Sequence, residues 1–97
     1  MTTPLTLTST TDPQGRSVVK VAGEIDLSNT DSFAAALDDV TGPLVVDLTE
    51  VLYIDSAGMS VLFAHAERAE IIATPLLAPI IEVSGLTSMA TIRGMEG

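Results

Sequence analysis

Residues 44–58 read LVVDLTEVLYIDSAG, and this stretch decides the fold class. Its first part, 44–48, is rich in β-branched residues with little alternation, which is typical of a central strand covered on both faces. The motif DSAG follows at 55–58. From Ala57 onward, apolar residues recur at i, i+3, i+4 and i+7, which predicts an amphipathic helix to about Glu70. The stretch therefore predicts a strand that turns into a helix at Ser56.

The N-terminal part predicts a β-hairpin. Threonines interleaved with apolar residues over Leu5–Thr11 indicate an exposed or edge strand. The sequence DPQG at 12–15 is a turn by composition, because proline and glycine supply the backbone angles that a turn requires. Ser17–Ala22 is then the second strand of the hairpin.

A first helix is predicted between this hairpin and the central strand. Ser28, with Asp31 three residues later, resembles a serine N-cap followed by an acidic first turn. Phe33 and Leu37 then fall at helical spacing. Residues 42–43, glycine and proline, end the helix.

The last third predicts a shorter β-α-β continuation. Residues 71–78 supply a strand, which Pro75 makes either an edge strand or a bent one. Pro79 opens a short helix that ends near Gly85, and 91–93 form a final strand. We therefore expect one α/β domain over residues 1–97: a mixed β-sheet flanked by helices, in the order β-β-α-β-α-β-α, with a degenerate C-terminal part.

Composition excludes several classes of function. The net charge is −9, from 13 acidic and 4 basic residues, so the surface repels nucleic acids and anionic membranes. It suits a protein partner with a basic patch, although many soluble proteins are simply acidic. There are no cysteines and His65 is the only histidine, which excludes disulfides and zinc–thiolate sites. We expect no metal and no cofactor.

The sequence shows no targeting signal. The longest uncharged apolar stretch, 71–81, is well short of the roughly 18–20 residues that a membrane-spanning helix needs. The N-terminal residues 1–4 (MTTP) have neither the basic flank nor the apolar region of a signal peptide. The expected location is the cytoplasm.

Ser56 has an ordinary structural interpretation. A helix start exposes unpaired backbone N–H groups, and serine is a favoured N-cap that accepts a hydrogen bond from one of them. Gly58 leaves the first turn uncrowded. Judged alone, Ser56 is more simply a helix cap than a functional residue.

The residues around Ser56 indicate more than a helix cap, because they form recognisable motifs. The stretch 45–58 resembles the central motif of the STAS family of anti-sigma factor antagonists: an apolar strand, Asp-Leu-Ser/Thr, an apolar-spaced turn, then Asp-Ser-Ser/Ala-Gly entering a helix. GEIDL at 23–27 is similar to a second signature of that family, and Gly85-Leu86 to a third, weaker one. The resemblance covers roughly 5–86.

The resemblance implies partner switching. A member of this family binds an anti-sigma factor that is itself a serine kinase, and so frees the sigma factor. The kinase phosphorylates the serine of the Asp-Ser-Ser/Ala-Gly motif, here Ser56, and binding is lost until a serine phosphatase removes the phosphate. We expect the chain to be monomeric when alone.

By position in the motifs, the resemblance also implies a partner-binding set. Ser56 is the phosphoacceptor, and Asp55 and Gly58 shape its loop. Ala57 stands where many members have a second serine. The remaining members of the set are two acidic residues of the neighbouring loop and two residues of the first helical turn: Glu24, Asp26, Met59 and Ser60.

Two other interpretations remain. Ser56-Ala57-Gly58 matches half of a hydrolase nucleophile elbow, but Ile54 stands where its first glycine belongs. The one possible base, His65, is nine residues along the same predicted helix, so we expect no enzymatic or catalytic residue. His65 is expected on the polar surface of that helix. The second alternative is a STAS protein-binding module, never phosphorylated, in another signalling assembly.

Overall fold

The chain folds as a sheet with helices on one face. The computed structural model describes residues 4–96. Its strands are β1 (Thr6–Thr11), β2 (Ser17–Ile25), β3 (Leu44–Ile54), β4 (Ala69–Ile72) and β5 (Thr91–Arg93). Its helices are α1 (Thr30–Asp38), α2 (Ser56–Ala64) and α3 (Ala78–Ser84), with the 3-10 turns η1 (Ala66–Arg68) and η2 (Leu86–Ser88). Residues 1–3, where no signal peptide is expected, lie outside this description, as does Gly97.

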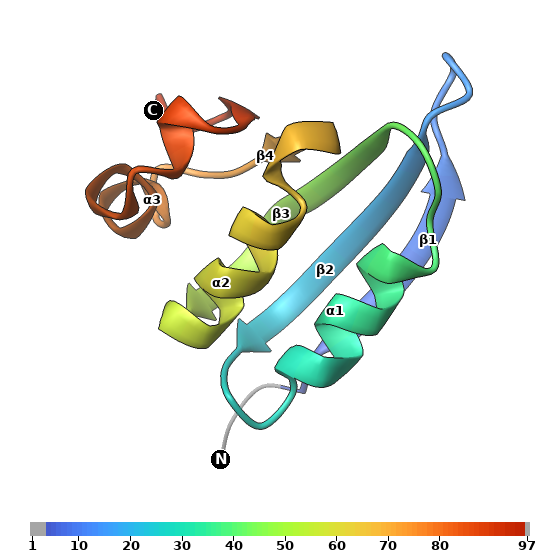
Figure 1. Ribbon diagram of the computed structural model, residues 1–97. Helices are drawn as coiled ribbons and strands as arrows, with labels where there is room; N and C mark the ends of the chain where they lie inside the picture. The colour runs from blue at the N-terminus through green and yellow to red at the C-terminus, as the bar shows by residue number, and fades with distance from the viewer. Residues whose placement is uncertain (1–3, 97) are drawn as a thin grey trace.

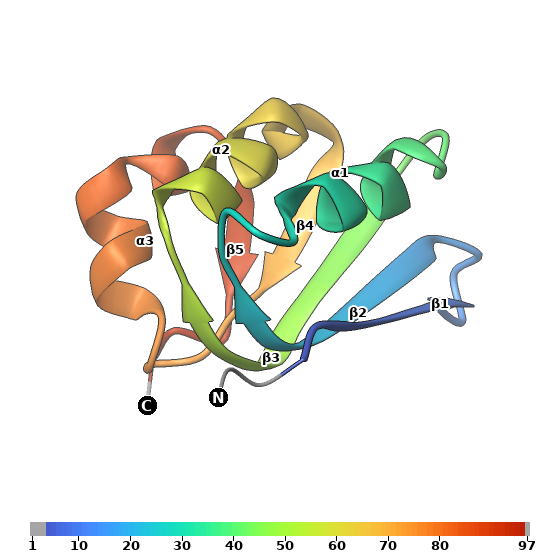
Figure 2. The same ribbon diagram turned by 90° about the horizontal axis from the view of Figure 1, so that it is seen from below.

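The sheet is mixed, with strand order β1-β2-β3-β4-β5. β1 pairs with β2 antiparallel, and every later pair is parallel. A helix connects each parallel pair, and α1, α2 and α3 follow one another across the sheet (Figures 1 and 2). The expected α/β class and element order are confirmed. Since parallel strands end on the same side, the carboxyl ends of β2 and β3 lie together.

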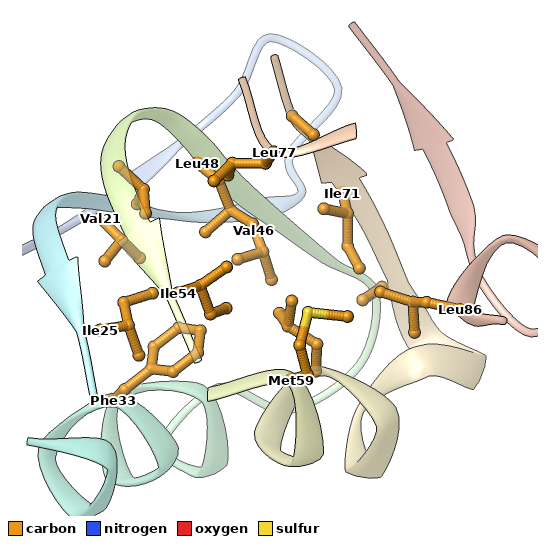
Figure 3. Close-up of a cluster of buried hydrophobic side chains, with 14 of the residues drawn as sticks. Val21, Ile25, Phe33, Val46, Leu48, Ile54, Met59, Ile71, Leu77 and Leu86 are labelled. Carbon is orange, nitrogen blue, oxygen red and sulfur yellow. The ribbon is translucent and has the colours of Figure 1, made fainter. Parts of the chain in front are cut away.

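The core lies between the sheet and its helices (Figure 3). Val19, Val21 and Ile25 of β2 are fully buried, and they face Phe33 and Leu37 of α1 as the helical spacing predicted. Lys20 alternates with these valines, so it lies on the other face of the sheet. The helices thus cover one face only. Residues 44–46 of β3 are nonetheless buried on both faces of the sheet, as the β-branched run predicted.

The second face carries three of the four basic side chains. Arg16 binds Asp12 at 2.7 Å and Glu70 at 3.2 Å, and Arg93 also binds Glu70, at 2.9 Å. Lys20 binds Glu50 at 2.6 Å. The Arg16 hydrogen bond to Glu70 spans the start of β3 and covers Val45, whose exposed fraction is only 2%. Ion pairs, not helices, therefore shield this face.

Several element boundaries differ from the prediction. The central strand continues to Ile54 instead of ending at residue 48, because the segment 49–54 pairs with β2 through a register shift. α2 stops at Ala64, since His65 leaves the helical conformation at φ −112° and ψ 7°. β4 therefore begins at Ala69. It lies between β3 and β5, so the edge position, one of the two predicted alternatives, is wrong.

The last third is short but regular. Pro75 falls in the turn after β4, where it interrupts no ladder hydrogen bond. Pro79 lies in the first turn of α3, and Gly85 ends that helix at φ 84°, both as predicted. The final strand is also confirmed. Within 4–96, no helix has the length and apolar character needed to cross a membrane.

Candidate functional site

Ser56 is the first residue of α2, and it lies on the surface. The predicted N-cap role of Ser56 is wrong. Asp55 is the cap: its backbone is extended, at φ −100° and ψ −174°, and its Oδ1 accepts a hydrogen bond from the Gly58 N–H at 3.1 Å. Within the described residues the Ser56 hydroxyl makes no hydrogen bond, and only the Ser56 carbonyl is used, by Ser60 Oγ at 3.0 Å. The hydroxyl is therefore presented to solvent.

Gly58 brings the start of α2 against the ends of two strands. A Cβ at this position would lie 2.6 Å from Ile54 Cγ1 and 2.7 Å from Ile25 Cγ2. These distances are shorter than a carbon–carbon contact allows. Glycine is required here by close packing. Because Gly58 is buried, it shapes the loop rather than offering surface to a partner.

A tightly bonded loop lies beside Ser56, between β2 and α1. Asn29 spans it: its Oδ1 accepts from the Asp26 N–H at 3.0 Å, and its Nδ2 donates to the Glu24 carbonyl at 2.8 Å. Asp26 Oδ1 in turn accepts from the Ser28 N–H at 2.9 Å and from the Ser28 hydroxyl. Ser28, the predicted helix cap, instead fixes this turn, and Asn29 precedes α1 without a side-chain cap. The loop conformation is therefore defined by its own side chains.

The two loops are joined into one surface. The Asp55 N–H donates to the Ile25 carbonyl at 3.2 Å, and Glu24 pairs with Tyr53 across β2 and β3. Glu24, Asp26 and Asp55 thus all lie near the carboxyl ends of β2 and β3. We define the Ser56 face as the exposed and partly exposed residues at this end of the sheet: Glu24, Asp26, Leu27, Ser28, Asn29, Tyr53, Asp55, Ser56, Ala57 and Ser60.

Among residues 4–96, no lysine or arginine side chain lies on the Ser56 face. No lysine or arginine occurs between Lys20 and Arg68. Lys20 pairs with Asp47 in the register of β2 and β3. Asp47 is seven residues before Ile54, so Lys20 lies about 23 Å along the strand from the end of β3. Arg68 is at the far end of α2, where its guanidinium donates to the carbonyls of Leu37 and Gly42. The charged side chains on the described part of the Ser56 face are therefore all acidic.

Met59 does not belong to this surface. Its side chain is only 4% exposed and packs in the core (Figure 3). The expected contact of Met59 with a partner is wrong, because position 59 faces the sheet one residue after the buried Gly58. Ser60 is exposed, and Ala57 is partly so. Of the residues implied in the first helical turn, these two remain available.

His65 is buried, contrary to its predicted place on the polar surface. Its Nδ1 lies 2.8 Å from the Val61 carbonyl, and its Nε2 lies 2.8 Å from Asp38 Oδ1 of α1. The ring thus links the ends of α1 and α2. This position is about 13 Å of helix from Ser56, from nine residues at 1.5 Å each.

Among the described residues, neither a metal-ligand cluster nor the depression at the other end of α2 involves Ser56. Among residues 4–96, no group of three or more histidine and acidic side chains is arranged to hold a metal ion. An open depression of about 310 Å³ lies at the other end of α2, lined by Phe63, Ala64, His65, Glu67, Arg68 and Met89. It does not involve the Ser56 face.

Three residues of this face were not singled out from the sequence. Asn29 organises the loop between β2 and α1, and its place two residues after the GEIDL motif is the only sequence signal for it. Leu27 and Tyr53 are large apolar residues that the fold leaves 78% and 50% exposed. Their exposure follows from the loop and the register, which hydrophobicity patterns do not reveal.

Comparison with known proteins agrees with the fold. Residues 9–92 match the protein family described as "Mlab, STAS domain". An anti-sigma factor antagonist from Mycobacterium paratuberculosis has a similar structure, with a TM-score of 0.79 and 27% identity over 92% of this chain and 85% of that chain. The antisigma-factor antagonist STAS domain from Rhodobacter sphaeroides aligns with a TM-score of 0.52 over 71% of this chain and 84% of that chain; at 22% identity it supports the fold alone. No curated protein matches.

Proposed function

Since the chain belongs to the STAS domain family, we propose that it is an anti-sigma factor antagonist. In this proposal it binds a serine-kinase anti-sigma factor in the cytoplasm through the Ser56 face and so releases a sigma factor. Phosphorylation of Ser56 by that kinase ends the binding, and a serine phosphatase restores it. The chain acts as a single domain and is monomeric when alone.

The observation that carries the proposal is that Asp55, and not Ser56, caps α2. Asp55 caps α2, so the Ser56 hydroxyl is not needed to hold the helix. Ser56 is exposed at the first helical position. A kinase can therefore reach the hydroxyl without unfolding the helix, and a phosphate can be added without breaking a structural hydrogen bond.

The position of Ser56 also suits a phosphate. A phosphate group adds about −1.5 to −2 charges at neutral pH. At the start of α2 it meets the positive end of the helix dipole and the unpaired N–H groups of the first turn. We therefore expect the phosphorylated protein to keep its fold.

Binding would instead be lost at the interface. The phosphate joins the carboxylates of Asp55 and Asp26 on a face that has no lysine or arginine nearby. Docking would bring these negative groups together away from water, which costs free energy unless the partner supplies additional positive charge. The proposed switch is a local change of charge on a preformed surface.

A hydrolase is disfavoured by the same geometry. Both nitrogens of His65 face acceptors near the end of α2, and the ring lies about nine helical residues from Ser56. A serine nucleophile needs its base within about 3 Å. We therefore propose a binding protein and not an enzyme.

A displacement experiment tests the proposal. Each serine-kinase anti-sigma factor of the source genome is purified in complex with its sigma factor, and the unmodified chain is added in excess. We expect the chain to release the sigma factor from at least one complex, as measured by size-exclusion chromatography. Retention of every sigma factor on its kinase would contradict the proposal.

A further inference from the structure

Large apolar side chains are exposed in two regions of the described chain. Leu76, Val83 and Met89 belong to the segment around α3 and η2. Leu27 and Tyr53 belong to the Ser56 face, and Leu52 precedes Tyr53 in β3. In the second region, Leu27 is two residues after Ile25, and Tyr53 is two residues before Asp55. The hydrogen bond between Asp55 and Ile25 therefore joins the two chain segments that carry these apolar residues.

The loop that presents Leu27 is organised before any partner arrives. The hydrogen bonds of Asn29 to Asp26 and Glu24 close the loop on both sides of Leu27. The Leu27 carbonyl lies 3.5 Å from the hydroxyl of the buried Thr30, which anchors the backbone at the tip. Since the backbone is already ordered, docking of Leu27 would lose little conformational entropy.

The charges around these apolar residues have one sign. Asp26 and Asp55 lie in the same two loops, and no lysine or arginine occurs between Lys20 and Arg68. The four basic side chains are all engaged elsewhere, in ion pairs or with the carbonyls at the end of α1. A partner for this surface must therefore bring the positive charge itself.

We infer that Leu27 and Tyr53 are the apolar anchors of the docking surface. Both side chains enter an apolar pocket on the partner protein, and lysines and arginines of the partner surround this pocket. This inference rests on the proposed function, and it adds the residues that supply the affinity and the chemistry of the surface that receives them. Apolar anchors at the centre of an interface commonly dominate its binding energy, while surrounding charges set the association rate.

The same charges exclude other occupants of this face. Nucleic acids and anionic lipids carry phosphates, which the carboxylates of Asp26 and Asp55 repel. A second copy of the chain would place carboxylates against carboxylates across a symmetric contact. A basic protein surface is the one class that complements both the apolar and the acidic parts.

The test uses the kinase whose sigma factor the chain releases. Its binding is titrated calorimetrically with the wild type, Leu27→Ala and Tyr53→Ala, each in low and high NaCl. Val83→Ala, at a position that is 89% exposed on α3, is the matched control. We expect both anchor variants to weaken binding about tenfold or more, the control to stay within about twofold, and the wild-type affinity to fall with salt.

The outcomes separate the two proposals. If the wild type binds but either anchor variant behaves like Val83→Ala, the anchor inference is overturned and the proposed function stands. A wild-type affinity that does not fall with salt overturns the basic pocket in the same way. If the wild type releases no sigma factor and binds none of the kinases, both proposals are overturned. Denaturation midpoints of the variants establish that each is folded, since neither side chain contributes to the core.

Discussion

The carboxylate of Asp55 accepts a hydrogen bond from the Gly58 N–H at 3.1 Å, and this contact defines the role of the serine between them. With the helix capped by Asp55, the hydroxyl of Ser56 is exposed and structurally dispensable. Asp55 thus stabilises the helix, while the neighbouring Ser56 is left for the proposed phosphorylation. Each can be tested by its own substitution.

Substitutions of Ser56 should change binding without changing the fold. Ser56→Ala is expected to unfold at the same denaturant concentration as the wild type and to bind the anti-sigma kinase constitutively. Ser56→Glu should also fold, because an acidic residue suits the first helical turn, but should bind at least about tenfold more weakly because its charge opposes docking. Pull-down and calorimetry with the kinase measure both effects.

Ser60→Ala is the matched control for these variants. Ser60 is exposed one turn further along α2. Because Ser60 belongs to the expected partner-binding set, the control concerns regulation: Ser60→Ala should leave the loss of binding on Ser56 phosphorylation unchanged. Wild-type affinity in Ser56→Glu would count against a switch by charge.

Removing the helix cap should cost stability. Asp55→Ala leaves the Gly58 N–H without its acceptor and is expected to lower the free energy of unfolding by about 1 kcal/mol. Asp55→Asn keeps a capping oxygen and should lose much less. Urea denaturation followed by circular dichroism measures the difference. Equal losses in the two variants would mean that the carboxylate acts by its charge and not as a cap.

Gly58→Ala should destabilise the protein, although alanine normally favours a helix. The added Cβ would press on Ile54 Cγ1 and Ile25 Cγ2, so side chains or backbone must move. We expect a loss of about 1–3 kcal/mol, which is typical of overpacking. Thermal and urea denaturation of Gly58→Ala beside Ser60→Ala measure it. A gain of about 1 kcal/mol, as expected for this change in an open helix, would contradict the close packing.

The contact between His65 and Asp38 should contribute measurably to the free energy of unfolding. Asp38→Ala removes the acceptor at 2.8 Å from Nε2 of the buried ring. We expect a loss of about 0.5–1 kcal/mol at neutral pH, because Asp38 itself is largely exposed to water. Asp39→Ala removes an adjacent exposed carboxylate and is the matched control. Identical stability of the two variants would show that the contact contributes nothing.

Asp12 should contribute to stability in a pH-dependent manner. Burial alone would raise the pKa of Asp12, but hydrogen bonds from the backbone and guanidinium of Arg16 and from the Gln14 N–H lower it below its usual value of 3.8. The lower folded pKa means that the contribution is complete above pH 3.8 and is lost as the pH falls further. The stability difference between wild type and Asp12→Asn should therefore shrink in that acidic range. A difference that grows in acid would contradict this sign.

Local chemistry made much of the fold predictable. The apolar spacing of Phe33 and Leu37, the β-branched run of β3, and the proline and glycine at the two ends of α3 all act through near neighbours. The errors concern long-range contacts. His65 becomes buried because Asp38, distant in sequence, lies opposite it, and β4 is internal because β5 pairs beside it.

The candidate site was predictable in position but not in detail. The motif located Ser56 at the start of a helix, since strand and helix patterns meet there. Which residue caps the helix depended on the extended backbone of Asp55, and the burial of Met59 depended on how α2 lies against the sheet. The exposure of Leu27 and Tyr53 required the loop and the strand register together. None of these is encoded in a local pattern of hydrophobicity.

The most direct test is the site of phosphorylation. The wild type, Ser56→Ala and Ser60→Ala are incubated with the cognate anti-sigma kinase and Mg-ATP, and intact masses and peptide maps are recorded. The account predicts a single phosphate, on Ser56, in the wild type and in Ser60→Ala, and none in Ser56→Ala. A kinase that binds the chain yet leaves Ser56 unmodified, or places its phosphate on another residue, would contradict the account.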